Sequence, residues 1–295
     1  MIHLFYKIMP NIYLNSSEIA ILINKNPFQK INNVVSKLWI KYFPENFNQF
    51  NIKYNINTSF LDETSIINDA LKINNIDFDI NNSLNSTSNS ELFSKKKEIK
   101  KLINDIPNDI IPTDQKNIIN PIDKKTLNKN IDHLMNKNFG TIHENDVLNI
   151  YLSYYPEFSA IKSSQYKSKL IFNNNGYNFF IGGIIDAMRN DGTIIEIKNR
   201  VNRLFKSLKD YEKIQAMSYL FIYNSNKLHL VESFNKNIFV IDVDYNEEYM
   251  NYIIKNIKIF TDFFFLFLNS DELKFDLIDN NESFHQKFIL FSKKN

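Results

Sequence analysis

Two carboxylates and an amine fall within two short apolar stretches near the middle of this chain. The segment "GGIIDAMRNDGTIIEIKNR", residues 182–200, holds Asp186, Glu196 and Lys198. Side chains alternate between the two faces of a strand. Glu196 and Lys198 would therefore share one face, and the isoleucines beside them would pack on the other.

A tight turn would bring the two carboxylates together. Asn190, Asp191 and Gly192 join the apolar stretches, and these residue types favour the positive-φ conformations of a hairpin. Asp186 would then lie close to Glu196. Two buried carboxylates repel each other unless a cation neutralises them. We therefore predict a metal ion at this position.

Oxygen ligands and the absence of cysteine favour Mg²⁺, for which Mn²⁺ can substitute. We expect Asp186, Glu196 and the backbone carbonyl of Ile197 to bind the metal. Lys198 would position or deprotonate the attacking water, with a pKa lowered by desolvation beside a cation. The natural electrophile for such an assembly is a phosphodiester.

A solvated ion pair on an ordinary edge hairpin would also place these charges together. Acidic-x-Lys triplets begin at Glu98, Asp114, Asp123 and Glu272 as well, so the triplet alone carries little information. The copy at Glu196 differs because it lies within an apolar stretch and follows an aspartate across a glycine turn.

Neighbouring residues have two interpretations each. Gln215 could hydrogen-bond Lys198 or the attacking water, or it could be a surface amide. Glu144 could be a favourable charge at a helix N-terminus or a third carboxylate facing the metal. Arg200 and Arg203, with the lysines that follow, could contact DNA phosphates or form a solvated face.

Composition narrows the class of protein. The 295 residues are 43% hydrophobic, which is enough to bury a sizeable core, and the formal charge of +2 gives no overall signal for nucleic acid. Without cysteine, the chain has no disulfides, thiolate zinc sites or cysteine-ligated iron–sulfur clusters. Its apolar runs are far shorter than the roughly 20 residues of a membrane span. We expect a soluble, intracellular protein without a membrane partner.

The pattern along the chain predicts three parts. Residues 1–50 would be N-terminal helices packed on a core, with two helices over 16–43 broken at Pro27. Residues 51–137 are polar and interrupted by prolines, which predicts a low-complexity insertion or linker with weak order. Residues 138–295 would form the core.

Within the core the expected order is α, β, β, β, α, β, β, α, a mixed α/β architecture. Gly140 would be a turn before a helix with Val147 and Tyr151 on one side. The later elements are strands over about 167–173, 177–186 and 193–198, a helix over 207–222, strands over 227–233 and 237–244, and a helix over 245–268 with its phenylalanines buried.

The hairpin segment, followed by "YEKIQAMSYL", resembles the PD-(D/E)XK nuclease superfamily. Within it, the segment is most similar to the lambda exonuclease-like or YqaJ-type viral recombinase branch, in the versions found in large DNA viruses. The residues at that branch's motif positions are Gly183, Asp186, Glu196, Lys198, Gln215 and Tyr219.

Two further segments carry the same resemblance. "NSSEIAILINKNPFQ" resembles the branch's N-terminal helix and places Ser17 at a phosphate-contacting hydroxyl. "FGTIHENDVLNIY" resembles its Gly...Glu helix and gives Glu144 the role of a metal-side glutamate. The resemblance covers about residues 12–43 and 138–268 and leaves the insertion unmatched.

The resemblance implies a restriction-endonuclease-like core, with a central mixed β-sheet flanked by helices, and a Mg²⁺-dependent deoxyribonuclease. It implies an exonuclease that resects linear duplex DNA in recombination or repair, as a homo-oligomer with a single-strand annealing protein. A viral protein would act where viral DNA replicates in the host cell. The alternatives are a structure-selective endonuclease, such as a resolvase or nickase, and a non-catalytic DNA-binding protein. The implied catalytic residues are Glu144, Asp186, Glu196, Lys198 and Gln215, and the implied DNA contacts are Ser17, Arg200, Arg203 and Tyr219.

Overall fold

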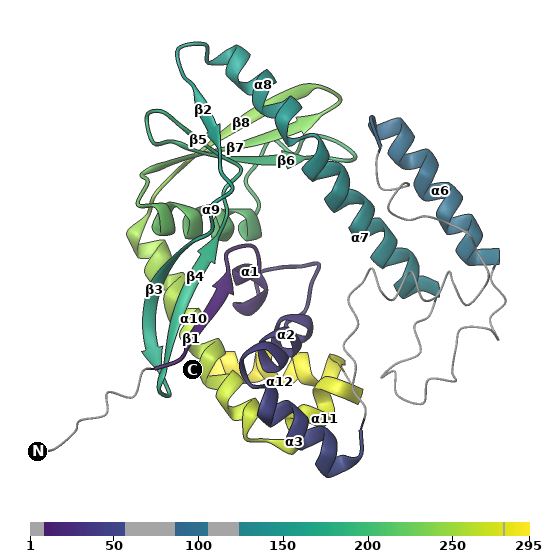
Figure 1. Cartoon of the computed structure of the whole chain (residues 1–295), viewed down its shortest axis with the longest axis vertical. Coiled ribbons are helices and arrows are strands. Elements are labelled where there is room, and N and C mark those ends of the chain that lie inside the picture. Colours follow the sequence, from purple (N-terminus) through teal and green to yellow (C-terminus); the bar gives the residue numbers. More distant parts are fainter. Residues whose placement is uncertain (1–8, 57–85, 106–123, 280) are drawn as a thin grey trace, which may run out of the picture.

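The computed structural model describes residues 9–56, 86–105, 124–279 and 281–295. It contains two mixed β-sheets flanked by helices (Figure 1). The mixed α/β class expected from the sequence is confirmed, whereas the single central sheet is divided into two. None of the helices in the described ranges is long and apolar enough to cross a membrane.

The smaller sheet has three strands in the order β1-β4-β3. Strand β1 (Asn11–Asn15), which the sequence analysis did not predict, runs parallel to β4 (Tyr177–Gly183). Strand β3 (Lys167–Asn174) is antiparallel to β4. Ile12 and Leu14 alternate with more exposed neighbours and bury β1 against the core.

The larger sheet has five strands in the order β2-β5-β6-β7-β8. Its central pair, β6 and β7, is parallel, and the other neighbouring strands are antiparallel. The strands are β2 (Ala160–Lys162), β5 (Ala187–Arg189), β6 (Ile194–Asn199), β7 (Lys227–Phe234) and β8 (Asn237–Asp244).

The chain passes from one sheet to the other at residues 184–186, so the strand predicted over 177–186 is interrupted. Pairing of β4 with β3 ends at Gly183, because β3 begins at its partner Lys167. The next paired residue, Ala187, joins β6 instead. Asp186 therefore lies in the link, directly before the larger sheet.

Helices cover both faces of the larger sheet. On one face, Val147 and Tyr151 of α8 (Glu144–Tyr154) pack against Ile195 and Ile197 of β6. On the other face lies α9 (Asp210–Tyr223), whose apolar residues share a core with those of β6 and β7 that face it. This arrangement confirms the predicted helix over 207–222 and places Glu196 and Lys198 on the α9 face.

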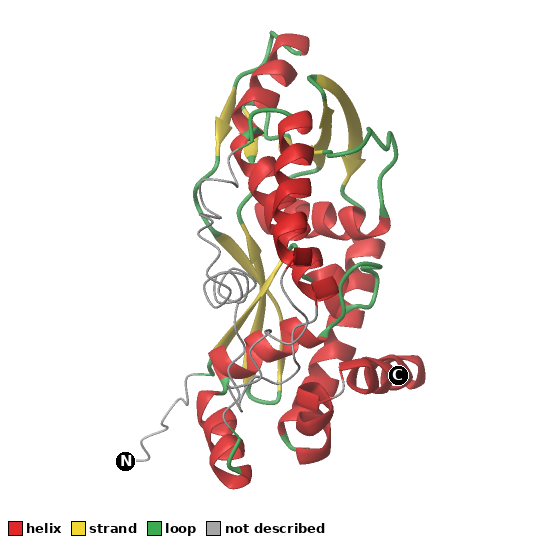
Figure 2. Cartoon of the chain, turned by 90° about the vertical axis from the view of Figure 1, so that its right-hand side faces the viewer, coloured by secondary structure: helices red, strands yellow, loops and turns green. Residues whose placement is uncertain are grey.

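The phenylalanine-rich helix α10 (Glu247–Leu268) buries its aromatic face as expected. Its Phe267 packs edge-on against Trp39, with ring centroids 5.0 Å apart. Helices from both ends of the chain gather there (Figure 1), and in Figure 2 the C-terminus lies on a helix of this group. They are α2 (Asn32–Tyr42), α3 (Pro44–Tyr54), α11 (Asp271–Asp279) and α12 (Asn281–Lys294). Helix α1 (Ile19–Leu22) lies closer to α9.

Pro27 separates α1 from α2, as predicted. Helices α11 and α12 were not predicted, because the sequence analysis assigned no element beyond residue 268.

Weak order over 51–137 is wrong for three stretches that the structure describes, of which the first is the end of α3 at residues 51–54. Residues 89–105 form α6 (Asn89–Asp105), and α7 (Lys124–Ile142) includes Gly140, the expected turn. The polar composition hid apolar residues that recur at helical spacing. These residues pack between α6 and α7 and are Leu92, Ile99, Ile103, Leu127, Ile131, Met135 and Phe139. The boundaries of the three predicted parts, 1–50, 51–137 and 138–295, stay a prediction.

We expect Met135→Ala to loosen both helices of this pair. Met135 is 1% exposed, and truncating a buried methionine costs about 2–5 kcal/mol. Amide hydrogen exchange should become faster in α6 and α7, whereas the exposed Lys137→Ala should leave it unchanged. Equal exchange in both variants would show that the pair is not a packed unit.

Candidate active site

The predicted hairpin is present and brings Asp186 beside β6. Strands β5 and β6 pair through Ala187 with Ile195, and Gly192 takes a positive φ of 85° in the turn. Asp186 precedes the paired residues, and its Oδ2 accepts a hydrogen bond of 2.6 Å from the backbone N–H of Ile197. The carboxylate thus lies along the edge of β6, beside the part of the strand that is not paired with β5.

The Ile197 carbonyl faces the same edge. The N–H and C=O of one strand residue point to the same side, and the N–H of Ile197 points to Asp186. One carboxylate and one backbone oxygen therefore lie together beside β6, as expected for the predicted metal ligands.

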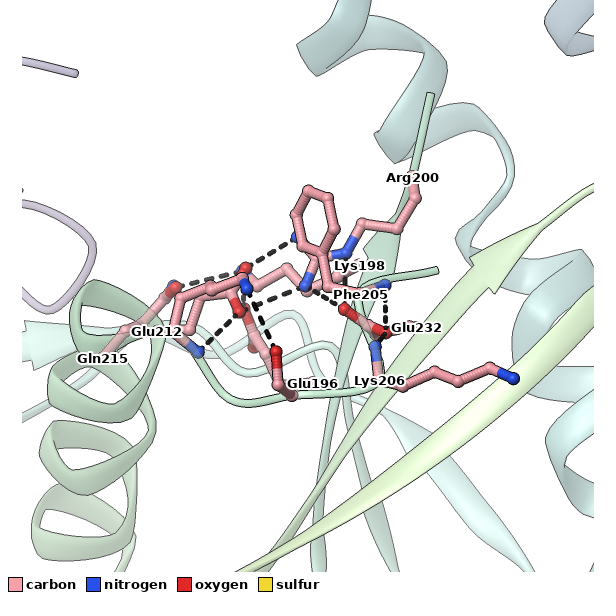
Figure 3. Close-up of polar contacts among 10 residues, drawn as sticks. Glu196, Lys198, Arg200, Phe205, Lys206, Glu212, Gln215 and Glu232 are labelled. Carbon is pink, nitrogen blue, oxygen red and sulfur yellow. Dashed lines mark hydrogen bonds and ion pairs between the residues drawn. The ribbon is translucent and has the colours of Figure 1, made fainter. Parts of the chain in front are cut away.

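Glu196 and Lys198 project together from β6 toward α9 (Figure 3). The ammonium of Lys198 donates to Glu196 Oε1 at 2.8 Å and to Gln215 Oε1 at 3.0 Å. The amide of Gln215 in turn donates to the hydroxyl of Tyr219 at 3.2 Å. The structure therefore assigns Gln215 to Lys198 rather than to the surface.

Glu196 is only 5% exposed, yet its second oxygen, Oε2, is buried without a hydrogen-bond partner among the described residues. Leaving a buried carboxylate oxygen unpaired is costly. An unpaired carboxylate oxygen close to Asp186 is the donor chemistry that a divalent cation requires. Asp186, Glu196 and the Ile197 carbonyl therefore fit Mg²⁺.

The pKa of Asp186 shifts upward, as for a buried carboxylate close to a second one. Protein groups alone also shift the pKa of Lys198 upward. Burial, and then the charge of Glu196, raise the pKa of Asp186 to about 8. Burial alone would lower the pKa of Lys198, but the carboxylates of Glu196 and Asp186 outweigh it and raise the pKa. Desolvation is the largest single effect on this pKa, but the neighbouring carboxylates together outweigh it. The lowered pKa expected for a lysine beside a bound cation stays a prediction.

Glu144 pairs with Lys162 through its side chain and is not grouped with the carboxylates of Asp186 and Glu196. It is the first residue of α8, and its Oε2 lies 3.1 Å from Lys162 Nζ. Its charge still contributes to the raised pKa of Asp186. Across the described ranges, no three His, Cys, Asp or Glu side chains are grouped closely enough to hold a metal ion. The carboxylates that the structure brings together are Asp186 and Glu196.

Arg200 lies in a buried ion-pair network next to this site (Figure 3). Its guanidinium donates to both oxygens of Glu212, at 2.7 and 3.1 Å, and its Nε donates to Glu232 at 2.9 Å. Glu232 also accepts the backbone N–H groups of Phe205 and Lys206. A phosphate contact by Arg200, as predicted, would require these bonds to break.

The sequence analysis missed Glu212 and Glu232. Glu232 lies within the buried strand β7, and a carboxylate inside an apolar strand is the same signal that drew attention to Glu196. Glu212 lies in the first turn of α9, where acidic residues are common, and so gave no signal.

The other predicted DNA contacts occupy three different settings. Ser17 is exposed in the turn before α1, whereas the neighbouring Ser16 is buried and its Oγ donates to the Gly182 carbonyl at 3.0 Å. Arg203 is exposed in the loop between β6 and α9. Tyr219 is 6% exposed, and a Cβ on Gly183 would lie 2.8 Å from its ring. Glycine at 183 thus lets β4 approach the tyrosine that contacts Gln215.

No protein-family model matches the chain, and a search of curated proteins finds no match. Among solved structures, the chain is similar to an alkaline exonuclease, LHK-Exo, from Laribacter hongkongensis, at 13% identity and a TM-score of 0.36, over 44% of this chain and 69% of that one.

The chain is also similar to the structure of SSO0001, at 14% identity and a TM-score of 0.36, over 69% of this chain and 86% of that one. LHK-Exo in complex with dAMP gives 13% identity and a TM-score of 0.35, over 44% of this chain and 68% of that one. At such TM-scores the similarities establish neither the fold family nor the activity of this chain.

We expect Arg200→Ala to destabilise the protein. Glu212 and Glu232 are 2% and 0% exposed, and removing the partner of buried charges costs about 3–5 kcal/mol. Urea denaturation should show this loss, whereas Arg203→Ala, at an exposed position, should change the free energy of unfolding by less than about 0.5 kcal/mol. An Arg200→Ala protein of normal stability that binds DNA weakly would instead make Arg200 a DNA contact.

Proposed function

We propose that this protein is a Mg²⁺-dependent deoxyribonuclease that hydrolyses DNA phosphodiesters. The observation that carries the proposal is the unpaired, buried oxygen of Glu196, whose other oxygen holds the ammonium of Lys198. A site with unbalanced carboxylates and an adjacent cationic donor suits a negatively charged electrophile once a cation is present.

Asp186, Glu196 and the carbonyl of Ile197 would hold the cation. Glu144 would add a ligand only if Lys162 released it. Bound Mg²⁺ would offset the charge of the phosphate and favour ionisation of a water molecule. Mn²⁺ accepts the same oxygen ligands and should substitute.

Lys198 would act as a charged donor. Its ammonium already donates to Glu196 and Gln215, and in the complex it would donate a hydrogen bond to the attacking water or to a phosphate oxygen. Gln215 fixes the direction of that ammonium, and Tyr219 fixes Gln215. Gln215 and Tyr219 are positioning residues in this account, because they act through Lys198.

We further propose an exonuclease that resects linear duplex DNA during recombination or repair, as a homo-oligomer with a single-strand annealing protein. What supports this finer proposal is the order of the motifs around Ser17, Glu144, Asp186 and Gln215 along the sequence.

Lys198→Ala should slow hydrolysis of linear duplex DNA about 10²–10⁴-fold in Mg²⁺ or Mn²⁺, because one positioned proton-transfer or donor group contributes that much. Release of acid-soluble nucleotides measures the rate. Lys255→Ala, at an exposed position on α10, is the matched control and should retain full activity. Hydrolysis that survives both Lys198→Ala and EDTA would overturn the mechanism.

Covalently closed circular duplex DNA distinguishes the two nuclease modes. An exonuclease needs an end, so we expect the circle to stay intact while a linear form of the same DNA is degraded. Nicked or linearised products, resolved on an agarose gel, would instead identify a structure-selective endonuclease.

A further inference from the structure

A cavity of about 690 Å³ lies between α6, α7 and the loop that follows β6. One side of it is formed by α6, which contributes Phe93, Lys96, Lys97, Lys100 and Lys101. Amide side chains from α6, α7 and the loop complete the lining. Four ammonium groups in one concave surface are concentrated enough to attract an anionic ligand.

The cavity keeps a positive balance after its internal contacts are counted. Asp132 is the acidic residue in its lining, and it pairs with Lys100 at 2.5 Å and lies 3.7 Å from Lys96. Lys97 and Lys101 are exposed. These two lysines are one helical turn apart on the same face of α6, so their ammonium groups can contact successive phosphates of one strand.

An aromatic ring continues this row. Phe93 lies one turn before Lys97, and it is 47% exposed despite its size. Exposed aromatic rings beside lysines in a groove are typical of single-strand binding, because unpaired bases stack on the ring while the cations contact the backbone. The bases of a duplex are already stacked inside the helix and cannot use Phe93 in this way.

The cavity is joined to the end of the catalytic strand. Val201 and Asn202 line it and follow Lys198 within the same short stretch of chain. The side chain of Asn89 at the start of α6 donates to the carbonyls of Arg200 and Val201, at 3.2 and 2.8 Å. Figure 1 shows α6 and α7 beside one another, with α7 next to β6.

We propose that the cavity between α6 and α7 binds a segment of single-stranded DNA, with phosphates on Lys97 and Lys101 and a base stacked on Phe93. This inference rests on the proposed function, because hydrolysis of one strand of a duplex leaves its complement single-stranded beside the site.

The test measures binding without hydrolysis. Fluorescence anisotropy with a labelled oligothymidylate in EDTA gives the affinity of the full-length protein over a range of salt concentrations. Phe93→Ala should weaken binding at least about fivefold, since stacking of one base contributes about 1–3 kcal/mol. Lys97→Ala combined with Lys101→Ala should reduce the log–log salt slope by about 1.4, because each single-strand phosphate contact contributes about 0.7.

Lys125→Ala combined with Lys129→Ala is the matched control. It removes the same charge from exposed positions on α7 that do not line the cavity, and it should leave the affinity for oligothymidylate close to that of the unchanged protein. Phe93→Ala should leave the affinity for a blunt duplex of equal length unchanged. Circular dichroism melting confirms that each variant is folded.

Two results would overturn the inference. In the first, the α6 variants bind oligothymidylate as tightly as the α7 control does. In the second, loss of Lys97 and Lys101 weakens the binding of polyglutamate but not the binding of oligothymidylate. That result would make the cavity a site for an acidic polypeptide. Failure of the proposed function is distinct, because a protein that binds oligothymidylate through Phe93 but hydrolyses no DNA would retain the cavity's role without the nuclease activity.

Discussion

The cost of burying charge at the end of β6 organises the site. Glu196 and Lys198 alternate along this strand and Arg200 directly follows it, and all three project into the interior beside α9. Buried charges require partners. All three nitrogens of the Arg200 guanidinium donate to Glu212 or Glu232, whereas Glu196 has one unpaired oxygen and shares its surroundings with Asp186. The group whose hydrogen bonds are complete stabilises the fold, and the group with an unpaired carboxylate oxygen is the candidate active site.

Neighbouring elements supply what this strand needs. Glu212, Gln215 and Tyr219 lie on one face of α9, at spacings of three and four residues, so one helix contacts both halves of the charge array. The break between β4 and β5 places Asp186 at the edge of β6. Gly183, at the end of β4, leaves the space that Tyr219 occupies. These supports fix the direction of the Lys198 ammonium through Gln215 and Tyr219.

Local periodicity explains what the sequence could predict. The hairpin and the shared face of Glu196 and Lys198 depend on short spacings. Strand β1 and the division into two sheets depend on pairing between distant segments, which spacing does not encode. Helices α6 and α7 were hidden by polar composition. Glu212 was hidden because acidic residues are common in the first turn of a helix, and the contact of Glu232 with Arg200 spans 32 residues. The direction in which the pKa of Lys198 shifts depends on how many carboxylates surround the amine once the chain is folded.

The central claim is that the unbalanced carboxylates of Asp186 and Glu196 form a cation site, and titration calorimetry with Mn²⁺ tests it most directly. The protein should bind Mn²⁺, and Glu196→Gln, which keeps the shape of the side chain but removes its charge, should abolish binding. Arg203→Ala, whose side chain is exposed in the loop after β6, should bind as the unchanged protein does. Mn²⁺ binding that Glu196→Gln leaves intact, or no binding by the unchanged protein, would contradict the account.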